Sequence, residues 1–93
     1  MSDSIYRNSY VAVRTANKIL AFLLLEGIEH VDIDVTYNQV RVTAFVHDMP
    51  LIEEVRAIMR FGNYYEATYE EKEYLTSPYP HMMCQTTLPF KNK

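Results

Sequence analysis

The fold of this chain is decided by the stretch Val31-Asp-Ile-Asp-Val-Thr-Tyr37, Asn38-Gln39 and Val40-Arg-Val-Thr-Ala-Phe-Val46. On each side of Asn38-Gln39 an apolar residue recurs at every second position, which places these residues on one face of a strand. With Asn38-Gln39 as a two-residue turn, Tyr37 pairs with Val40 and Val35 with Val42, and all apolar pairs share that face. The stretch therefore predicts a β-hairpin with one buried and one solvated face; a longer loop with a shifted register is the alternative.

A helix precedes the hairpin. Its apolar positions from Val13 to Leu24 recur at helical spacing, and Gly27 suits the left-handed residue that follows a helix. Phe22 and Leu25 widen the apolar stripe, so this helix is buried on more than one side or meets a partner. Residues 10–14 have two interpretations: a short strand with Thr15 capping a helix from residue 16, or a continuous helix from about residue 9. We favour the strand, because it completes a known arrangement.

The second half of the chain predicts a helix, a strand and an arm. Asp48 suits an N-cap, and the apolar face of the helix continues to Met59. Residues 64–69 alternate weakly and predict a last strand, and the charged residues 70–73 are expected to be solvated. Pro78, Pro80 and Pro89 favour an extended segment without regular structure.

The predicted fold class is α+β: a two-layer sandwich with (β)αββαβ order, in which two helices cover one face of an antiparallel ferredoxin-like sheet. We expect a flexible N-terminus at 1–8, a single domain at 9–75 and an extended Pro-containing C-terminal arm at 76–93.

Residues 16–69 resemble the small metallochaperone-type ferredoxin-like domains. The phrase Gly27-Ile-Glu-His-Val-Asp-Ile-Asp-Val, the hairpin and the segment Gly62-Asn63-Tyr64 carry the resemblance. That family binds metal through two cysteines separated by two residues ahead of the first helix. The corresponding segment here, Ile5-Tyr-Arg-Asn-Ser-Tyr10, has no cysteine, so the resemblance implies the fold and not the metal function.

Net charge, cysteine content and the length of the apolar runs exclude some classes of function and location. The 93 residues carry a net charge of −3, which argues against nucleic acid, because its binders usually present a basic patch. The single cysteine, Cys84, cannot form an internal disulfide, and the longest apolar run is too short to span a bilayer. We therefore expect a cytoplasmic protein without a membrane span.

The chain shows no catalytic or cofactor signature, so we expect neither an enzyme nor a cofactor. The metal-ligand candidates are His30, His47, His81 and Cys84. His30 and His47 fall opposite each other in the predicted register, which would allow shared ligation. We favour partly exposed histidines at a strand end over a metal site, because a structural zinc site needs four closely spaced ligands.

Eight tyrosines in a short chain favour protein contacts, because tyrosine is enriched at interfaces. The predicted interaction residues lie in the C-terminal third: Tyr64, Tyr65, Tyr69, Tyr74, Tyr79, Met82, Met83 and Phe90. The resulting hypothesis is a homodimeric protein-interaction module, of the kind that phages make as inhibitors or adaptors against host proteins. The alternative is a ligand- or metal-sensing ferredoxin-like regulatory domain.

Overall fold

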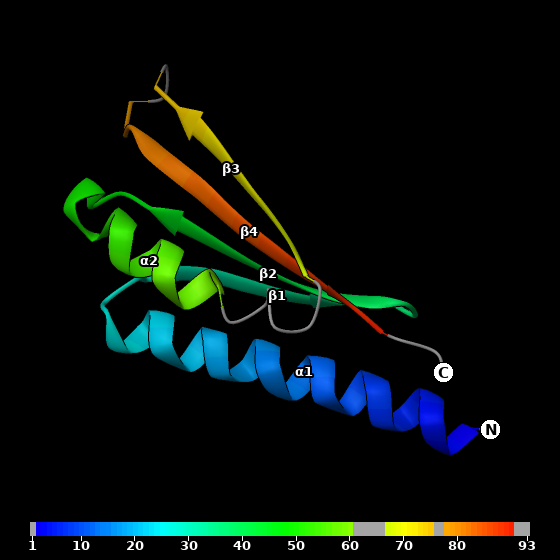
Figure 1. Ribbon diagram of the computed structural model, residues 1–93. Helices are drawn as coiled ribbons and strands as arrows, with labels where there is room; N and C mark the ends of the chain where they lie inside the picture. Colours follow the sequence, from blue (N-terminus) through cyan, green and yellow to red (C-terminus); the bar gives the residue numbers. More distant parts are fainter. Residues whose placement is uncertain (1, 61–66, 76–77, 91–93) are drawn as a thin grey trace.

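The computed structural model describes residues 2–60, 67–75 and 78–90, with residues 2–8 described as backbone only. Its elements are α1 (Ser2–Leu25), β1 (His30–Val35), β2 (Gln39–Val46), the short 3-10 helix η1 (Met49–Leu51), α2 (Ile52–Met59), β3 (Thr68–Tyr74) and β4 (His81–Pro89). The strands form an antiparallel sheet in the order β1-β2-β4-β3. Figure 1 shows both helices on one side of this sheet, as in the expected α+β two-layer arrangement.

The strand predicted at residues 10–14 is wrong, because α1 runs unbroken from Ser2 to Leu25. Its backbone also includes residues 2–8, which the sequence assigned to a flexible N-terminus. Thr15 does not cap a helix: its hydroxyl donates to the carbonyl oxygen of Val11, one turn earlier, at 2.9 Å. That bond satisfies a buried threonine inside a helix. The stripe facing the sheet consists of Ala12, Thr15, Ala16, Ile19 and Leu23.

The end of α1 is as predicted. Gly27 has a φ of 91°, in the left-handed region that favours glycine. The backbone N–H of Gly27 donates to the carbonyl of Leu24 at 3.0 Å, and that of Ile28 donates to Leu23 at 3.1 Å. These two bonds form a Schellman motif, and Ile28 packs in the core with Leu23. The motif turns the chain from α1 into β1.

The hairpin forms with a register two residues away from the prediction. Val35 pairs with Val40, Ile33 with Val42, and the turn is centred on Tyr37 and Asn38 instead of Asn38 and Gln39. The N–H of Thr36 donates to the carbonyl of Gln39 at 2.9 Å, and the Thr36 hydroxyl donates to the Asn38 side-chain oxygen at 2.9 Å. A shift of two residues keeps the paired side chains of both strands on their predicted faces. Tyr37, predicted to pair with Val40 on the buried face, instead lies in the turn and is 93% exposed, and Val35 at the end of β1 is 54% exposed.

The separate C-terminal arm is a wrong prediction, because His81–Pro89 is the inner strand β4, paired with β2 on one side and β3 on the other. The prolines do not interrupt it: Pro78 and Pro80 precede the strand, and Pro89 ends it. Between them the side chains alternate, and those that face the helices are Met82, Cys84, Thr86 and Leu88, all buried. Residues 76–77 and 91–93 lie outside the described residues.

The ferredoxin-like arrangement is not confirmed. With no strand at residues 10–14, β4 occupies an inner position, and the strand order is β1-β2-β4-β3. The last predicted strand is displaced as well: β3 covers Thr68–Tyr74 and includes the charged residues 70–73, while residues 64–66 lie outside the described residues. An edge strand tolerates such charges, because one side of it faces water.

The core lies between the helices and the inner strands. The buried residues of β2 are Val40, Val42, Ala44 and Val46. They lie beside the buried side chains of β4 in the same sheet and face the buried stripe of α1. α2 contributes Val55 and Met59. The opposite face of the sheet has no helix on it in Figure 1. We call this second surface the open face.

Candidate functional site

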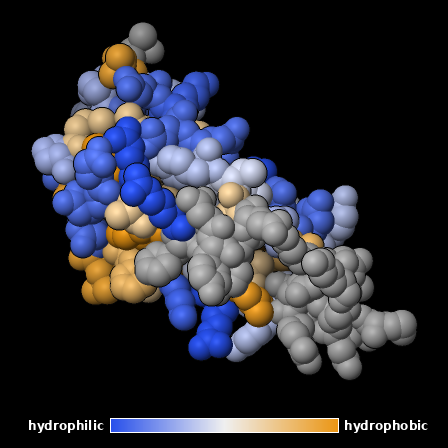
Figure 2. Space-filling view, in the orientation of Figure 1, coloured by the Kyte–Doolittle hydropathy of each residue, from blue (hydrophilic) through white to orange (hydrophobic). Residues whose placement is uncertain are grey.

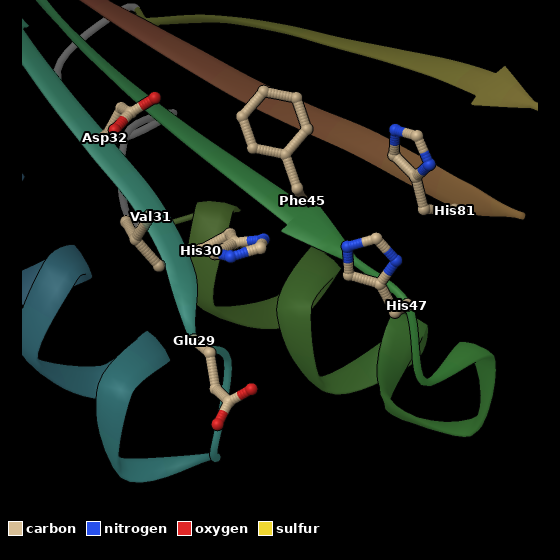
Figure 3. Close-up of a pocket in the computed structure, with 7 residues that line it drawn as sticks. All are labelled: Glu29, His30, Val31, Asp32, Phe45, His47 and His81. Atoms are coloured by element: carbon tan, nitrogen blue, oxygen red, sulfur yellow. The ribbon is translucent and has the colours of Figure 1, made fainter. Parts of the chain in front are cut away.

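Three histidines gather at one end of the open face. His30 begins β1, His47 follows β2 directly, and His81 begins β4. Figure 3 shows His47 between the other two rings. The ring centres of His30 and His47 lie 5.6 Å apart, and those of His47 and His81 lie 5.0 Å apart. The strands therefore bring together three imidazoles that are 17 and 34 positions apart in sequence.

Aromatic side chains from β2 and β3, the two strands on either side of β4, flank this row of histidines. Tyr74, the cross-strand partner of His81, stacks on its ring with 4.8 Å between centres and 10° between planes. Phe45 lies 6.0 Å from His81, centre to centre. Lys72 places its Nζ 5.1 Å from the centre of the Tyr74 ring. We call the set His30, His47, His81, Phe45 and Tyr74 the histidine cluster.

One ring of the cluster is oriented by the backbone. Nδ1 of His81 lies 2.9 Å from the carbonyl oxygen of Tyr79. A carbonyl oxygen only accepts, so this hydrogen bond requires the proton on Nδ1. In the neutral ring, Nε2 then keeps a free lone pair.

An open depression of about 470 Å³ borders the cluster. Its walls include His30, His47 and His81 together with the carboxylates of Glu29 and Asp32; Val31 and Phe45 also line it. Figure 3 shows these side chains around the beginning of β1 and the end of β2. The depression thus combines imidazole nitrogens with carboxylate oxygens.

The structure changes the placement of the candidate metal ligands in two ways. His30 pairs with Phe45, not His47, although the rings of His30 and His47 remain diagonal neighbours. Cys84 lies three residues beyond His81 on β4, and an odd separation puts it on the opposite face of the strand. There it is buried, and burial raises the pKa of its thiol. Within the described residues, no three His, Cys, Asp or Glu side chains are already arranged to hold one ion.

The predicted interaction residues do not form one surface. Met82 is buried, and Tyr69 and Phe90 pack against the core on the helix side of the sheet. Tyr74 and Met83 lie half-buried on the open face, and Tyr79 is 74% exposed. Tyr64 and Tyr65 lie outside the described residues.

A charged network on the helix side was not foreseen. The guanidinium of Arg56 donates to both carboxylate oxygens of Glu71, at 2.6 and 3.1 Å, and to Glu53 at 2.7 Å. The hydroxyl of Tyr69 donates to Glu71 at 2.6 Å. The Arg56 hydrogen bond holds the pKa of Glu71 below its usual value, while burial raises the pKa of Tyr69. The link between Arg56 and Glu71 fastens α2 to the edge strand β3, and no local pattern reveals it because the two residues are 15 positions apart in sequence.

The last turns of α1 expose large apolar side chains, in the stretch that the sequence marked as too widely apolar for one buried face. Phe22 is 42% exposed, Leu24 53% and Leu25 81%. Spacings of three and four residues on a helix place Ala21 beside Leu24 and Leu25, and Phe22 beside Leu25. In Figure 2 hydrophobic colour gathers at the end of the molecule where α1 stops. We call Ala21, Phe22, Leu24 and Leu25 the α1 patch.

No helix in the part of the chain that the structure describes is long and apolar enough to cross a bilayer. No known protein family, curated protein or solved structure matches this chain.

Proposed function

We propose that this chain is a non-enzymatic protein-interaction module: a small cytoplasmic inhibitor or adaptor, of the kind that phages make against host proteins, which acts as a homodimer. The α1 patch carries the proposal. Leu25 at 81% exposure and Leu24 at 53% present branched apolar side chains to water on neighbouring positions of one helix. Contiguous apolar surface of this kind marks protein contacts, because its burial removes water from apolar area.

Charge supports a protein partner over nucleic acid. The chain has a net charge of −3. On the open face, Asp32 and Asp34 project from β1 and Glu70 from β3, at positions that alternate with the helix-facing side chains. These carboxylates would repel a phosphate backbone.

The experiment compares the oligomeric state of the wild-type chain with that of the double variant Leu24→Glu/Leu25→Glu, by light scattering across a range of concentrations. We expect a wild-type dimer and a monomeric variant that still unfolds cooperatively, because both side chains face water in the single chain. The variant's melting temperature should not depend on protein concentration, whereas that of the dimer should. Asn17→Glu is the matched control, since it adds a charge at another exposed position of α1 and should leave the dimer intact.

Two observations together would contradict this proposal. The wild type would be monomeric, and the wild type and the double variant would capture the same proteins from a lysate. The α1 patch would then bind nothing, and the interaction module would lose its support.

A ligand- or metal-sensing regulatory domain is the second candidate function. One observation favours it: the fold collects every histidine of the chain in one cluster. A protein-interaction module does not require its histidines to lie together.

A further inference from the structure

The histidine cluster has the donor atoms of a transition-metal site. Neutral imidazole nitrogens are common ligands of Zn²⁺, Cu²⁺ and Ni²⁺, whereas Mg²⁺ and Ca²⁺ prefer oxygen. His30, His47 and His81 come from β1, the end of β2 and β4, so the sheet holds their backbones at fixed spacing.

The distances between the rings fit a shared ion. A zinc–nitrogen bond is about 2 Å long, and tetrahedral angles then put two ligating imidazole centres roughly 5 Å apart. The observed separations are 5.0 Å for His47 and His81 and 5.6 Å for His30 and His47. His47 is therefore the common member of two pairs that are both close to the ligating distance.

The surroundings of His81 match those of a metal ligand. Metal-binding histidines usually donate their second ring N–H to a carboxylate or a backbone carbonyl, which fixes the tautomer and the ring plane. Nδ1 of His81 makes this bond with the Tyr79 carbonyl at 2.9 Å. The stacked Tyr74 ring further restricts the His81 plane.

Charge decides between a cation and an anion. Glu29 and Asp32 line the same depression as the three imidazoles. Their carboxylates attract a cation and repel an anion, and either could supply an oxygen ligand. The neighbouring Lys72 lies over the ring of Tyr74, which itself stacks on His81.

We propose that His30, His47 and His81 bind a borderline transition-metal ion such as Zn²⁺. His47 and His81 form the first pair, and His30 joins by rotation of its exposed side chain, since the described residues contain no triad already in place. Exposed side chains change rotamer within nanoseconds, so this adjustment is rapid. Cys84 takes no part, because it is buried on the other face of the sheet. The inference deepens the second candidate function and is independent of the α1 patch.

The test is calorimetric titration of Zn²⁺ into the untagged full chain at neutral pH, with Mg²⁺ as the comparison ion. We expect one Zn²⁺ per chain and no Mg²⁺ binding. Loss of a partner that merely orients a ligand weakens binding about 10- to 100-fold, so His47→Gln should weaken Zn²⁺ binding by at least about tenfold. Asp34→Asn is the control, because it removes a carboxylate of β1 that does not line the depression; it should leave the affinity unchanged.

Three results would overturn the proposal: no saturable Zn²⁺ binding, equal affinities of His47→Gln and wild type, or one ion shared by two chains. His30→Gln provides a second variant at an exposed position, should His47→Gln disturb the fold, and it should also weaken binding. Zn²⁺ that binds as expected but changes neither the melting temperature nor the oligomeric state would support the site and contradict a sensing role.

Discussion

The position of Leu88 makes the C-terminal strand testable by one substitution. Leu88 lies on β4 with 0% of its surface exposed, in the segment that sequence patterns assigned to a separate arm. Replacing a buried leucine with alanine costs about 2–5 kcal/mol, because transfer free energy is lost and a cavity remains. In a domain of this size, about 1 kcal/mol lowers the melting temperature by about 4–8 °C. Leu88→Ala should therefore lower the melting temperature by at least about 8 °C.

Leu75→Ala is the matched control for this experiment. Leu75 follows β3 and is 70% exposed, so the same chemical change should alter the free energy of unfolding by no more than about 0.5 kcal/mol. Both variants are measured by circular dichroism during heating and during urea titration. If Leu88→Ala melts together with Leu75→Ala, β4 is not part of the core and the reasoning fails.

Truncation after Leu75 extends the same test. It removes β4, and β3 then has no strand to pair with, since β4 is its neighbour in the sheet. We expect the shortened chain to show no cooperative unfolding transition. A cooperative transition would restore the interpretation of residues 76–93 as an arm.

Three more predictions follow from burial and charge. Val42→Asp should unfold the domain, because an unpaired buried carboxylate costs several kcal/mol. Val35→Asp lies on the same face of the sheet but should remain folded, because Val35 is 54% exposed. Circular dichroism distinguishes the folded from the unfolded variant, and two folded variants would contradict the assignment of the buried face. The lowered pKa of Glu71 means that its ion pair stabilises the fold above the unfolded pKa near 4.5 and that this contribution is lost as pH falls through the folded value. Glu71→Gln should therefore lose less stability than wild type on acidification, and equal losses in urea titrations would contradict the pair. Thr86→Val should raise the free energy of unfolding by about 1 kcal/mol or more, because the buried Thr86 hydroxyl has no hydrogen-bond partner among the described residues; a lower urea midpoint would contradict this.

Local sequence patterns were sufficient for the faces of the hairpin and the end of α1. The period-two pattern of residues 31–46 identifies the buried face without knowledge of the turn, because a shift of two residues preserves side-chain parity. Gly27 ends α1 for a local reason too, since glycine enters the left-handed region without a steric penalty.

The candidate sites, like the fold, were predicted only in part from the sequence. The broad apolar stripe near Leu25 indicated in sequence a helix that is buried on more than one side or meets a partner, and in the structure Leu24 and Leu25 are exposed. The sequence also singled out His30, His47 and His81, but paired His30 with the wrong neighbour and added Cys84. The contribution of Tyr74 to the cluster depends on β3 lying beside β4, which no local pattern shows.

The sequence by itself thus determined which residues of the hairpin alternate and where α1 stops. Only the tertiary structure decided that residues 81–89 form an inner strand, because a strand's neighbours are selected by burial between segments far apart in the chain. The same pairing decides the histidine cluster: β2 lies between β1 and β4, so side chains from three separate segments meet at one end of the open face.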